Sequence, residues 1–373
     1  MEWKRYKLGD MLSYEQPTPF IVESTDYNDS YETPVLTAGK SFIIGYTDET
    51  SGIYDQLPVI IFDDFTTSTQ FVNFPFKVKS SAMKILTANE KLVLPKFIYY
   101  RMQIIEFDHS THKRYWIQQY SKIQVDLPPI DEQRRIVSRI EEMFSELDNS
   151  VSTLQKTKEQ LAVYRQAVLK EAFDSIEADT VCIQDVCENI VDCPHSTPKW
   201  TREGYLCLRT TNFRRGYFDL SEPNYVSKDT FDIRNQRLIP MPGDVLYSRE
   251  GAILGLACII PSDTYVCLGQ RMMLLRAGKK LSNMYLMHFL NSPRLTNFVA
   301  SVTGGSASPH VNVGDIKKFQ MPFPDIEEQN RIVGFIESRL SVCDSIERTI
   351  DTALQQADAM RQSILKQAFE GRL

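Results

Sequence analysis

The chain has 373 residues, of which 42% are apolar and 24% are charged, and its formal net charge is −6. This length predicts two domains with cores of their own, and the composition excludes a disordered or membrane-embedded chain. The acidic balance argues against a freestanding nucleic-acid binder, which usually has a basic surface. Seven cysteines and no apolar signal segment predict free thiols in a reducing compartment, and hence a cytoplasmic protein without membrane contact.

Residues 1–129 are predicted to form the first domain. Short runs of β-branched and aromatic residues, such as 57–62, predict a small sheet, and a helix is expected at 95–106. A hydroxyl-rich loop follows the strand at 57–62, and cations and aromatic residues mix near residue 112. Such side chains suit contacts with phosphates and bases. The candidate contacts are Lys40, Thr66, Thr67, Ser68, Thr69, Gln70, His112, Lys113, Arg114 and Tyr115, with core packing as the alternative for Tyr115.

Residues 130–173 recur at 326–369 with a constant offset of 196 and no gap, and 18 of the 44 aligned positions are identical. Such a long repeat implies duplication of a whole domain together with its helix. Both copies follow prolines, carry acidic residues in the first turn and contain no internal Gly or Pro except Gly334. These features predict one long helix at 130–173 and a second one, with the C-terminus, at 326–373.

Apolar residues recur at every seventh position of both predicted helices, which indicates a coiled-coil seam. If the helices pair antiparallel, the two domains lie at opposite ends of a rod, related by a pseudo-twofold axis. The alternative is a pair of ordinary bundle helices. Further apolar positions, such as Tyr164 and Ile346, either pack on the globular domains or bind another chain. The seam residues are Ile140, Leu147, Leu154, Leu161 and Val168, then Ile336, Cys343, Ile350, Ala357 and Ile364.

Residues 174–325 are predicted to form the second domain, with a strand at 244–247 and a helix at 282–300. Residues 200–320 hold 15 basic and 9 acidic residues, a net of +6, whereas the rest of the chain has a net of −12. Arginine reads guanine, Asn and Gln read adenine, and hydroxyl groups bind phosphates. For any one arginine, the alternative is a solvated surface charge. The candidate DNA contacts are Arg209, Thr211, Asn212, Arg214, Arg215, Ser248, Arg249, Gln270, Arg271, Ser306, Ser308, His310 and Asn312.

Catalytic motifs are not found in the sequence. It lacks the glycine-rich, zinc-protease and serine-hydrolase patterns, and it has no methyltransferase or divalent-metal nuclease signature. Cys182, Cys187, Cys193 and His195 cluster, but their spacing is not a usual zinc spacing, and buried thiols are the simpler interpretation. We therefore predict no catalytic residues and no metal site.

The repeated helices resemble those of the specificity subunit of type I restriction-modification systems. Both copies contain Glu-Gln-x-Arg-Ile-Val near the start, at 132–137 and 328–333, and both close on Arg-Gln-x-Val/Ile-Leu-Lys-x-Ala-Phe. The segments 60–65, 248–251 and 309–313 fit the same family. The resemblance implies an α/β (α+β) fold with internal duplication. Two target-recognition domains with small mixed or twisted sheets would be separated by two long antiparallel coiled-coil helices.

The resemblance also implies a non-catalytic role. Each domain would read one half of a bipartite site in double-stranded DNA, while the helices set the spacer and dock two modification (methyltransferase) subunits. S-adenosylmethionine, ATP and magnesium would belong to the modification and restriction subunits, and this chain would bind no cofactor. We expect weak DNA binding by the chain alone, and a change of Arg249 to Ala to relax recognition of one half-site. The alternatives are a coiled-coil adaptor that binds only proteins, and the specificity part of a fused enzyme.

Overall fold

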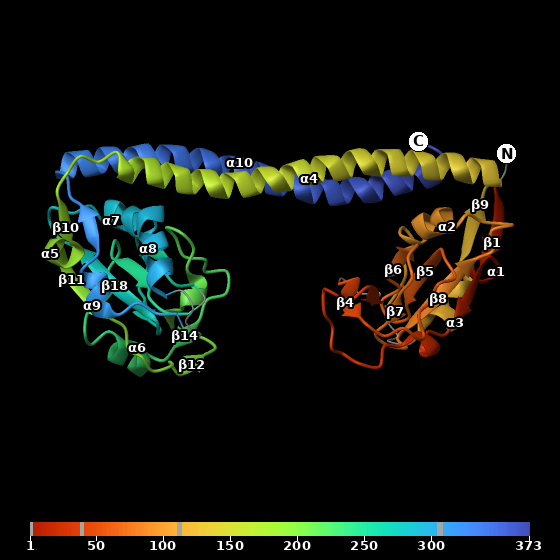
Figure 1. The fold of residues 1–373 in the computed structure, drawn as a ribbon, viewed down its shortest axis with the longest axis horizontal. Coiled ribbons are helices and arrows are strands. Elements are labelled where there is room, and N and C mark those ends of the chain that lie inside the picture. Colours follow the sequence, from red (N-terminus) through yellow and green to blue (C-terminus); the bar gives the residue numbers. More distant parts are fainter. Residues whose placement is uncertain (1–2, 38–40, 110–113, 252, 304–308) are drawn as a thin grey trace. The chain divides into compact units, whose positions relative to one another are not determined.

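The computed structural model describes residues 3–37, 41–109, 114–251, 253–303 and 309–373. The chain divides into two compact units, one formed by residues 1–154 with 352–373 and the other by residues 155–351. Each unit contains one globular region and parts of two long helices (Figure 1). We call residues 3–129 the first globular region and residues 175–325 the second. Within the described residues, no helix has an apolar stretch of membrane-spanning length.

The described residues of the first globular region form nine short strands and three short α-helices. The strands are β1 (Lys4–Lys7), β2 (Leu12–Glu15), β3 (Thr33–Leu36), β4 (Ile43–Thr47), β5 (Val59–Asp63), β6 (Thr69–Val72), β7 (Lys77–Val78), β8 (Met83–Ala88) and β9 (Gln124–Leu127), and the helices are α1 (Leu8–Met11), α2 (Pro95–Met102) and α3 (Tyr115–Gln118). They form an antiparallel sheet β2-β8-β5-β6, a mixed sheet β4-β3-β7 and a β1-β9 pair.

The second globular region repeats this arrangement. Its strands are β10 (Thr180–Cys182), β11 (Cys187–Asp192), β12 (Trp200–Thr201), β13 (Tyr205–Leu208), β14 (Tyr225–Val226), β15 (Val245–Ser248), β16 (Ala257–Ile259), β17 (Cys267–Leu268), β18 (Met272–Ala277) and β19 (Gln320–Pro322), and its helices are α5 (Ile183–Val186), α6 (Lys228–Arg234), α7 (Asn283–Leu290), α8 (Pro293–Thr303) and α9 (Val313–Lys317). They form an antiparallel sheet β11-β18-β15-β16, a mixed sheet β12-β14-β13-β17 and a β10-β19 pair.

The strand order is the same in both regions, because β2-β8-β5-β6 and β11-β18-β15-β16 connect their strands in the same sequence order. In each mixed sheet one central strand has an antiparallel and a parallel neighbour, β3 between β4 and β7, and β13 between β14 and β17. The predicted fold class, small mixed sheets in a duplicated chain, is confirmed. The duplication was visible in the helices alone, since the globular sequences have diverged.

A helix joins each sheet to the long helices. In the first unit Phe97 of α2 lies edge-on to Phe369, 5.2 Å between ring centroids, and in the second Phe289 of α7 packs on Phe173 at 5.7 Å. The single helix expected at 282–300 is two helices, α7 and α8, with Pro293 at the start of α8. Proline cannot continue a preceding helix, because it lacks an N–H and restricts the residue before it.

The long helices are α4 (Ile130–Asp174) and α10 (Ile326–Phe369). In the second unit Arg165 on α4 pairs with Asp344 on α10 at 2.7 Å, and in the first unit Arg361 on α10 pairs with Asp148 on α4. Arg361 is the repeat equivalent of Arg165, and Asp344 is the repeat equivalent of Asp148, so the second pair is the first with α4 and α10 exchanged. The two residue numbers of each pair add up to the same value, as they do for any two residues that face each other in a single antiparallel register. The same antiparallel register therefore holds in each unit. The predicted antiparallel pairing is confirmed.

The predicted seam residues differ in burial. Seven of these residues are buried. They are the first and last seam residues of α4 and all five seam residues of α10: Ile140, Val168, Ile336, Cys343, Ile350, Ala357 and Ile364. Leu147, Leu154 and Leu161 are half-buried. In their neighbourhood Lys158 bonds to Asp351 at 2.6 Å. The seam is therefore flanked by ion pairs, as is usual beside a coiled-coil core.

Candidate nucleic-acid interface

The β5–β6 turn presents the hydroxyl-rich loop of the first globular region. Asp63 Oδ1 accepts the backbone N–H groups of Phe65 and Thr66, both at 2.8 Å, which closes the turn. Thr67 has a φ of 57°, a left-handed conformation. His109 Nε2 lies 3.0 Å from both Thr67 Oγ1 and the carbonyl of Thr66. Several local bonds thus fix the loop, in which the predicted contacts Thr66 and Ser68 are exposed and Thr67 is half-buried.

The other predicted contacts of this region differ in exposure. Arg114 is exposed at the start of α3, and Gln70 is half-buried. The Thr69 hydroxyl is buried and accepts a bond from the Gln103 amide. Tyr115 is 1% exposed and packs between Phe107 and the core, so its ring does not reach a surface that DNA could touch. The prediction of a DNA contact is corrected for Tyr115. Lys40, His112 and Lys113 lie outside the described residues.

Arg249, which directly follows β15, is buried in the second globular region. Its side chain is 6% exposed, and its Nε and Nη2 donate to the two carboxylate oxygens of Asp192 at 2.9 and 3.3 Å. Its Nη1 lies 2.8 Å from Glu250 Oε1. Two carboxylates therefore hold all three nitrogens of the guanidinium inside the region, away from a surface that a guanine could reach. Ser248 is also fully buried and bonds to the carbonyl of Ile253. Direct contact with DNA is corrected for both residues.

Several exposed polar side chains surround this buried pair. His195 has a side chain that is 62% exposed, and its Nε2 lies 2.9 Å from Asp192 Oδ2. Arg271 is exposed and has a φ of 70°, while Gln270 accepts the hydroxyl of Thr197 at 2.9 Å. His310 is exposed and forms a β-bridge with Glu250.

The loops that carry these residues are bonded to each other. The N–H of Arg249 donates to the carbonyl of Arg271 at 3.0 Å, and its carbonyl accepts the N–H of Val311 at 2.9 Å. The structure therefore brings together the predicted contacts Gln270, Arg271 and His310. Asn312 is exposed at the start of α9 and donates to Asp315 at 3.2 Å. Ser306 and Ser308 lie outside the described residues.

The loop after β13 carries the other predicted arginines. Arg209 is exposed, and its guanidinium lies 5.4 Å from the ring centroid of Trp200. Arg214 is held by the carbonyls of Thr211 and Phe213 and by Asp219, at 3.0, 2.9 and 2.8 Å. Of the arginines in this loop, Arg209 is thus the better placed to contact a phosphate.

The remaining residues of the loop complete the predicted set. Thr211 is exposed. Arg215 is exposed and donates to the carbonyl of Asn291 at 3.1 Å. Asn212 is buried, because its side chain closes the loop between Arg209 and Asp219, and so its prediction as a DNA contact is corrected.

Sequence reasoning missed two exposed groups at this surface, namely His195 and Trp200. His195 was considered only as a metal ligand, and its role beside Asp192 depends on strand pairing. Trp200, which is 39% exposed, is one of only three tryptophans, and the available signal was Lys199 directly before it and Arg202 two positions after it. In the described residues no three His, Cys, Asp or Glu side chains could jointly hold a metal. Of the clustered cysteines, Cys193 is buried and Cys182 and Cys187 are half-buried, and desolvation raises the pKa of the Cys187 thiol to about 12.

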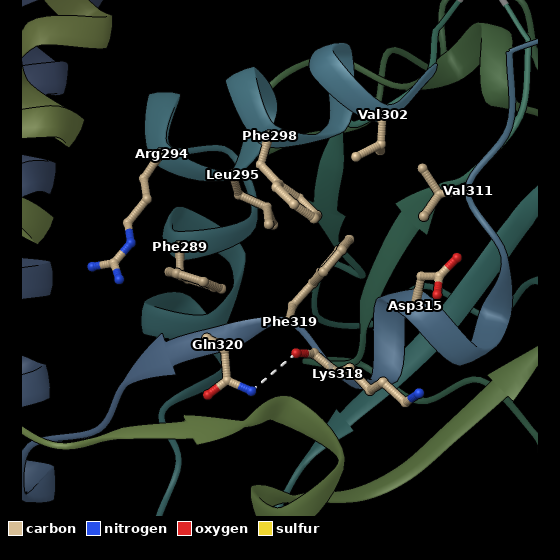
Figure 2. Close-up of a pocket in the computed structure, with 10 residues that line it drawn as sticks. All are labelled: Phe289, Arg294, Leu295, Phe298, Val302, Val311, Asp315, Lys318, Phe319 and Gln320. Atoms are coloured by element: carbon tan, nitrogen blue, oxygen red, sulfur yellow. Dashed lines mark hydrogen bonds between the residues drawn. The ribbon is translucent and has the colours of Figure 1, made fainter. Parts of the chain in front are cut away.

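A pocket of about 640 Å³ lies beside α8 in the second region (Figure 2). Its wall is apolar, with Phe298 and Phe319 facing one another 6.2 Å apart, and Arg294 and Lys318 stand at its edge. The lining contains no Ser, Thr, Cys or His side chain. The loops around Arg249, with their exposed cations and amides, are therefore the better candidate for a functional surface.

Comparisons with known proteins identify the family of this chain. The model of the type I restriction modification DNA specificity domain matches residues 1–162 and 176–356. The EcoR124I/EcoR124II specificity subunit of Escherichia coli is 31% identical over 97% of this chain and 91% of its own length. Two solved structures share the fold at 18% identity. One is a chain of a type I restriction-modification complex, with a TM-score of 0.72 over 100% of this chain and 98% of that one. The other is the HsdS subunit of Thermoanaerobacter tengcongensis, with a TM-score of 0.52 over 100% and 97%. The chain therefore belongs to the family of type I restriction-modification DNA specificity proteins.

Proposed function

We propose that this chain recognises a bipartite site in double-stranded DNA, with one half-site read by each globular region. The observation that carries the proposal is the repeated fold, which presents different side chains at equivalent positions. Arg114 directly precedes Tyr115, whose N–H bonds to the turn after β5. His310 directly precedes Val311, whose N–H bonds to the turn after β15. Arg114 and His310 are both exposed. A fold that keeps its strands and changes its exposed polar residues suits the reading of two unlike sequences.

The distribution of charge supports shared binding of the DNA. Residues 200–320 have a net charge of +6 within a chain of −6. Because phosphate contacts supply much of the affinity for DNA, an acidic chain should bind weakly alone and tightly once partners add contacts. We therefore expect tight, salt-sensitive binding only with modification subunits.

The paired helices would dock two modification (methyltransferase) subunits and set the spacer. In the second unit, apolar side chains of α4 and α10 remain exposed, among them Val163 at 71% and Val342 at 58%. Exposed apolar groups beside a charged seam are typical of protein interfaces. The catalytic chemistry, with S-adenosylmethionine, ATP and magnesium, would belong to the modification and restriction subunits. The seven free cysteines suit a reducing cytoplasm.

The proposal is tested by reconstituting the chain with its modification subunits and methylating a library of randomised duplexes. Sequencing of the methylated products should return two fixed half-sites separated by a spacer of unspecified sequence. Nanomolar, sequence-specific binding by the chain alone would contradict shared binding, and a single uninterrupted site would contradict the split reading. If the chain were a protein adaptor, the complex would shift no duplex in a gel, whatever the sequence.

The role of the helices is tested separately by insertion. Seven helix-compatible residues placed after Leu154 and after Asp351 preserve the seven-residue seam and lengthen each helix by about 10 Å. The spacer should then grow by about three base pairs, at 3.4 Å per pair, with the half-sites unchanged. A change in the recognised half-sites would show that the helices do more than hold the regions apart.

A further inference from the structure

The turns that follow β5 and β15 each contain one buried charge, and the two charges are opposite. The backbone N–H of Asp64 donates to the carbonyl of Ala82, just before β8, at 3.1 Å. The backbone N–H of Arg249 donates in the same way to the carbonyl of Arg271, just before β18, at 3.0 Å. The carbonyls of Asp64 and Arg249 accept the N–H groups of Tyr115 and Val311, each at 2.9 Å. Asp64 and Arg249 therefore occupy the same position of the repeated fold.

In the first region the buried anion is Asp64 and the cation comes from β8. Lys84 Nζ lies 3.2 Å from Asp64, and each side chain is 1% exposed. Asp64 also accepts the backbone N–H of Trp116 at 2.8 Å, and Lys84 donates to Gln16 at 3.0 Å. The pair thus joins the ends of β2, β5 and β8 to the segment that begins α3.

In the second region the positions of cation and anion are exchanged. Lys84 lies opposite Phe62 in the β5–β8 pair, and Met273 lies opposite Tyr247 in the β15–β18 pair, so Met273 takes the place of Lys84. The anion is Asp192 instead, which lies opposite Met273 at the end of β11.

Arg249 holds together the loops that present the exposed polar groups. Through its side chain it fixes Asp192, which in turn contacts His195, and through its backbone it bonds to Arg271 and Val311. The guanidinium is buried, so it cannot itself reach a base without rearrangement. A buried charge is tolerated only when it is paired, and loss of one partner is strongly destabilising.

We propose that the buried pair Arg249–Asp192 is a positioning device for DNA recognition, equivalent to Asp64–Lys84 with the charges exchanged. Arg249 does not read a base. It fixes the loops from which His195, Arg271 and His310 contact the half-site of the second region. This inference rests on the proposed function, since it assigns roles within the proposed DNA-reading surface.

The test transplants the pair of the first region into the second. The exchange variant carries Asp192→Gln, Arg249→Asp and Met273→Lys, with Glu250→Gln to remove a carboxylate that would face the new Asp. Reconstituted with modification subunits, it methylates the randomised library, and its thermal melting is compared with that of the unaltered chain. We expect a folded protein that methylates the same two half-sites. If Arg249 read a base, discrimination at one base pair of one half-site would fall by about tenfold or more.

A second variant guards against misfolding of the first. Asp192→Asn with Arg249→Gln replaces the ion pair by a neutral amide pair of similar shape, and it should also keep the half-sites. Arg271→Ala, in the otherwise unaltered chain, should relax one half-site without a change in melting temperature. Unaltered half-sites in Arg271→Ala, or failure of both pair variants to fold, would overturn the proposal. If the unaltered complex itself methylates no defined sequence, the proposed function fails instead.

Discussion

Gln133 and Gln329, which are 196 positions apart, make the same three hydrogen bonds. Gln133 Oε1 accepts the N–H of Leu94 at 2.8 Å, and its Nε2 donates to the carbonyls of Leu92 and Pro128 at 3.0 and 2.9 Å. Gln329 repeats the pattern at the start of α10, with one accepted bond at 2.9 Å and two donated bonds at 3.1 and 2.9 Å. Each glutamine ties a long helix to the segment that leads into α2 or α7.

Replacement of either glutamine by alanine should destabilise its unit. Both side chains are fully buried, so truncation leaves one N–H and two carbonyls without partners. Such a loss costs roughly 1–3 kcal/mol. The two glutamines share no partner, and the costs should therefore add in Gln133→Ala/Gln329→Ala. Urea unfolding measures the effect, with the exposed Gln160→Ala on α4 as the matched control. A loss no larger than that of the control would mean that these bonds are not structural.

The exchanged ion pairs of the long helices predict a second effect. Arg165 is 23% exposed and contacts Asp344 at 2.7 Å and Glu347 at 2.9 Å. Arg165→Asp would set three carboxylates together, at a cost of about 1 kcal/mol that high salt should reduce. Adding Asp344→Arg should recover part of the loss. Helix melting followed by circular dichroism checks this, with the exposed Lys170→Asp as control. An equal loss in the control would show a general charge effect.

The helices were predictable because their signals are local. A seven-residue period and an ungapped repeat specify the helix type, its ends and its partner without knowledge of the rest of the fold. The end of α10 coincides with the end of the repeat at 326–369. It stops at Phe369, and Gly371 follows in a left-handed conformation with a φ of 71°. A residue in the left-handed conformation commonly ends a helix, and glycine adopts that conformation without a steric penalty.

The contact residues were predictable only as candidate loops, because exposure depends on distant partners. Arg249 and Arg271 both occupy turns next to strands, yet one is buried and the other exposed. The difference is Asp192, which is 57 positions from Arg249 in the sequence and beside it in space. The exchange of charge between Asp64 and Arg249 also hid the repeat, since equivalent positions do not look alike in an alignment of the two regions.

The bond between His288 and Glu337 predicts a dependence on pH. His288 Nε2 donates to Glu337 Oε1 at 2.6 Å, and this bond holds the pKa of Glu337 below its ordinary value of 4.5. A carboxyl whose pKa is lowered by folding stabilises the fold above its unfolded pKa. That stabilisation is lost as the pH falls through the lower pKa of the folded state.

Glu337→Gln should therefore lower the melting temperature at pH 7, and the difference from the unaltered chain should shrink below about pH 4.5. Melting curves between pH 7 and pH 3.5 measure this difference. Asp358→Asn, an exposed carboxylate on the same helix, serves as the control and should show a smaller change. A gap that stays constant or widens toward acid would show that the hydrogen bond does not favour the ionised carboxyl.

Arg209 should act as a phosphate contact. Its guanidinium is exposed and stacks 5.4 Å from the Trp200 ring, a position that leaves its donors available. Arg209→Ala should weaken binding by the complex about equally for all duplexes and lower the slope of log affinity against log salt by about 1. Fluorescence anisotropy at several salt concentrations measures both quantities. Arg214→Ala is the contrast, since Arg214 is bonded within its loop and should affect stability more than the salt slope. Loss of one half-site alone would identify Arg209 as a base reader.

The buried pair of the first region gives the largest predicted loss of stability. Lys84→Met copies the residue found at the equivalent position, Met273, but leaves Asp64 buried at 1% exposure without its cation. Removal of one partner of a buried ion pair typically costs about 3–5 kcal/mol, because the remaining charge is uncompensated. Adding Asp64→Asn removes that charge and keeps an oxygen for the N–H of Trp116, so the double variant should recover much of the loss. Urea unfolding of the two variants decides the matter. If Lys84→Met were as stable as the unaltered chain, the ion pair would not hold the turn after β5.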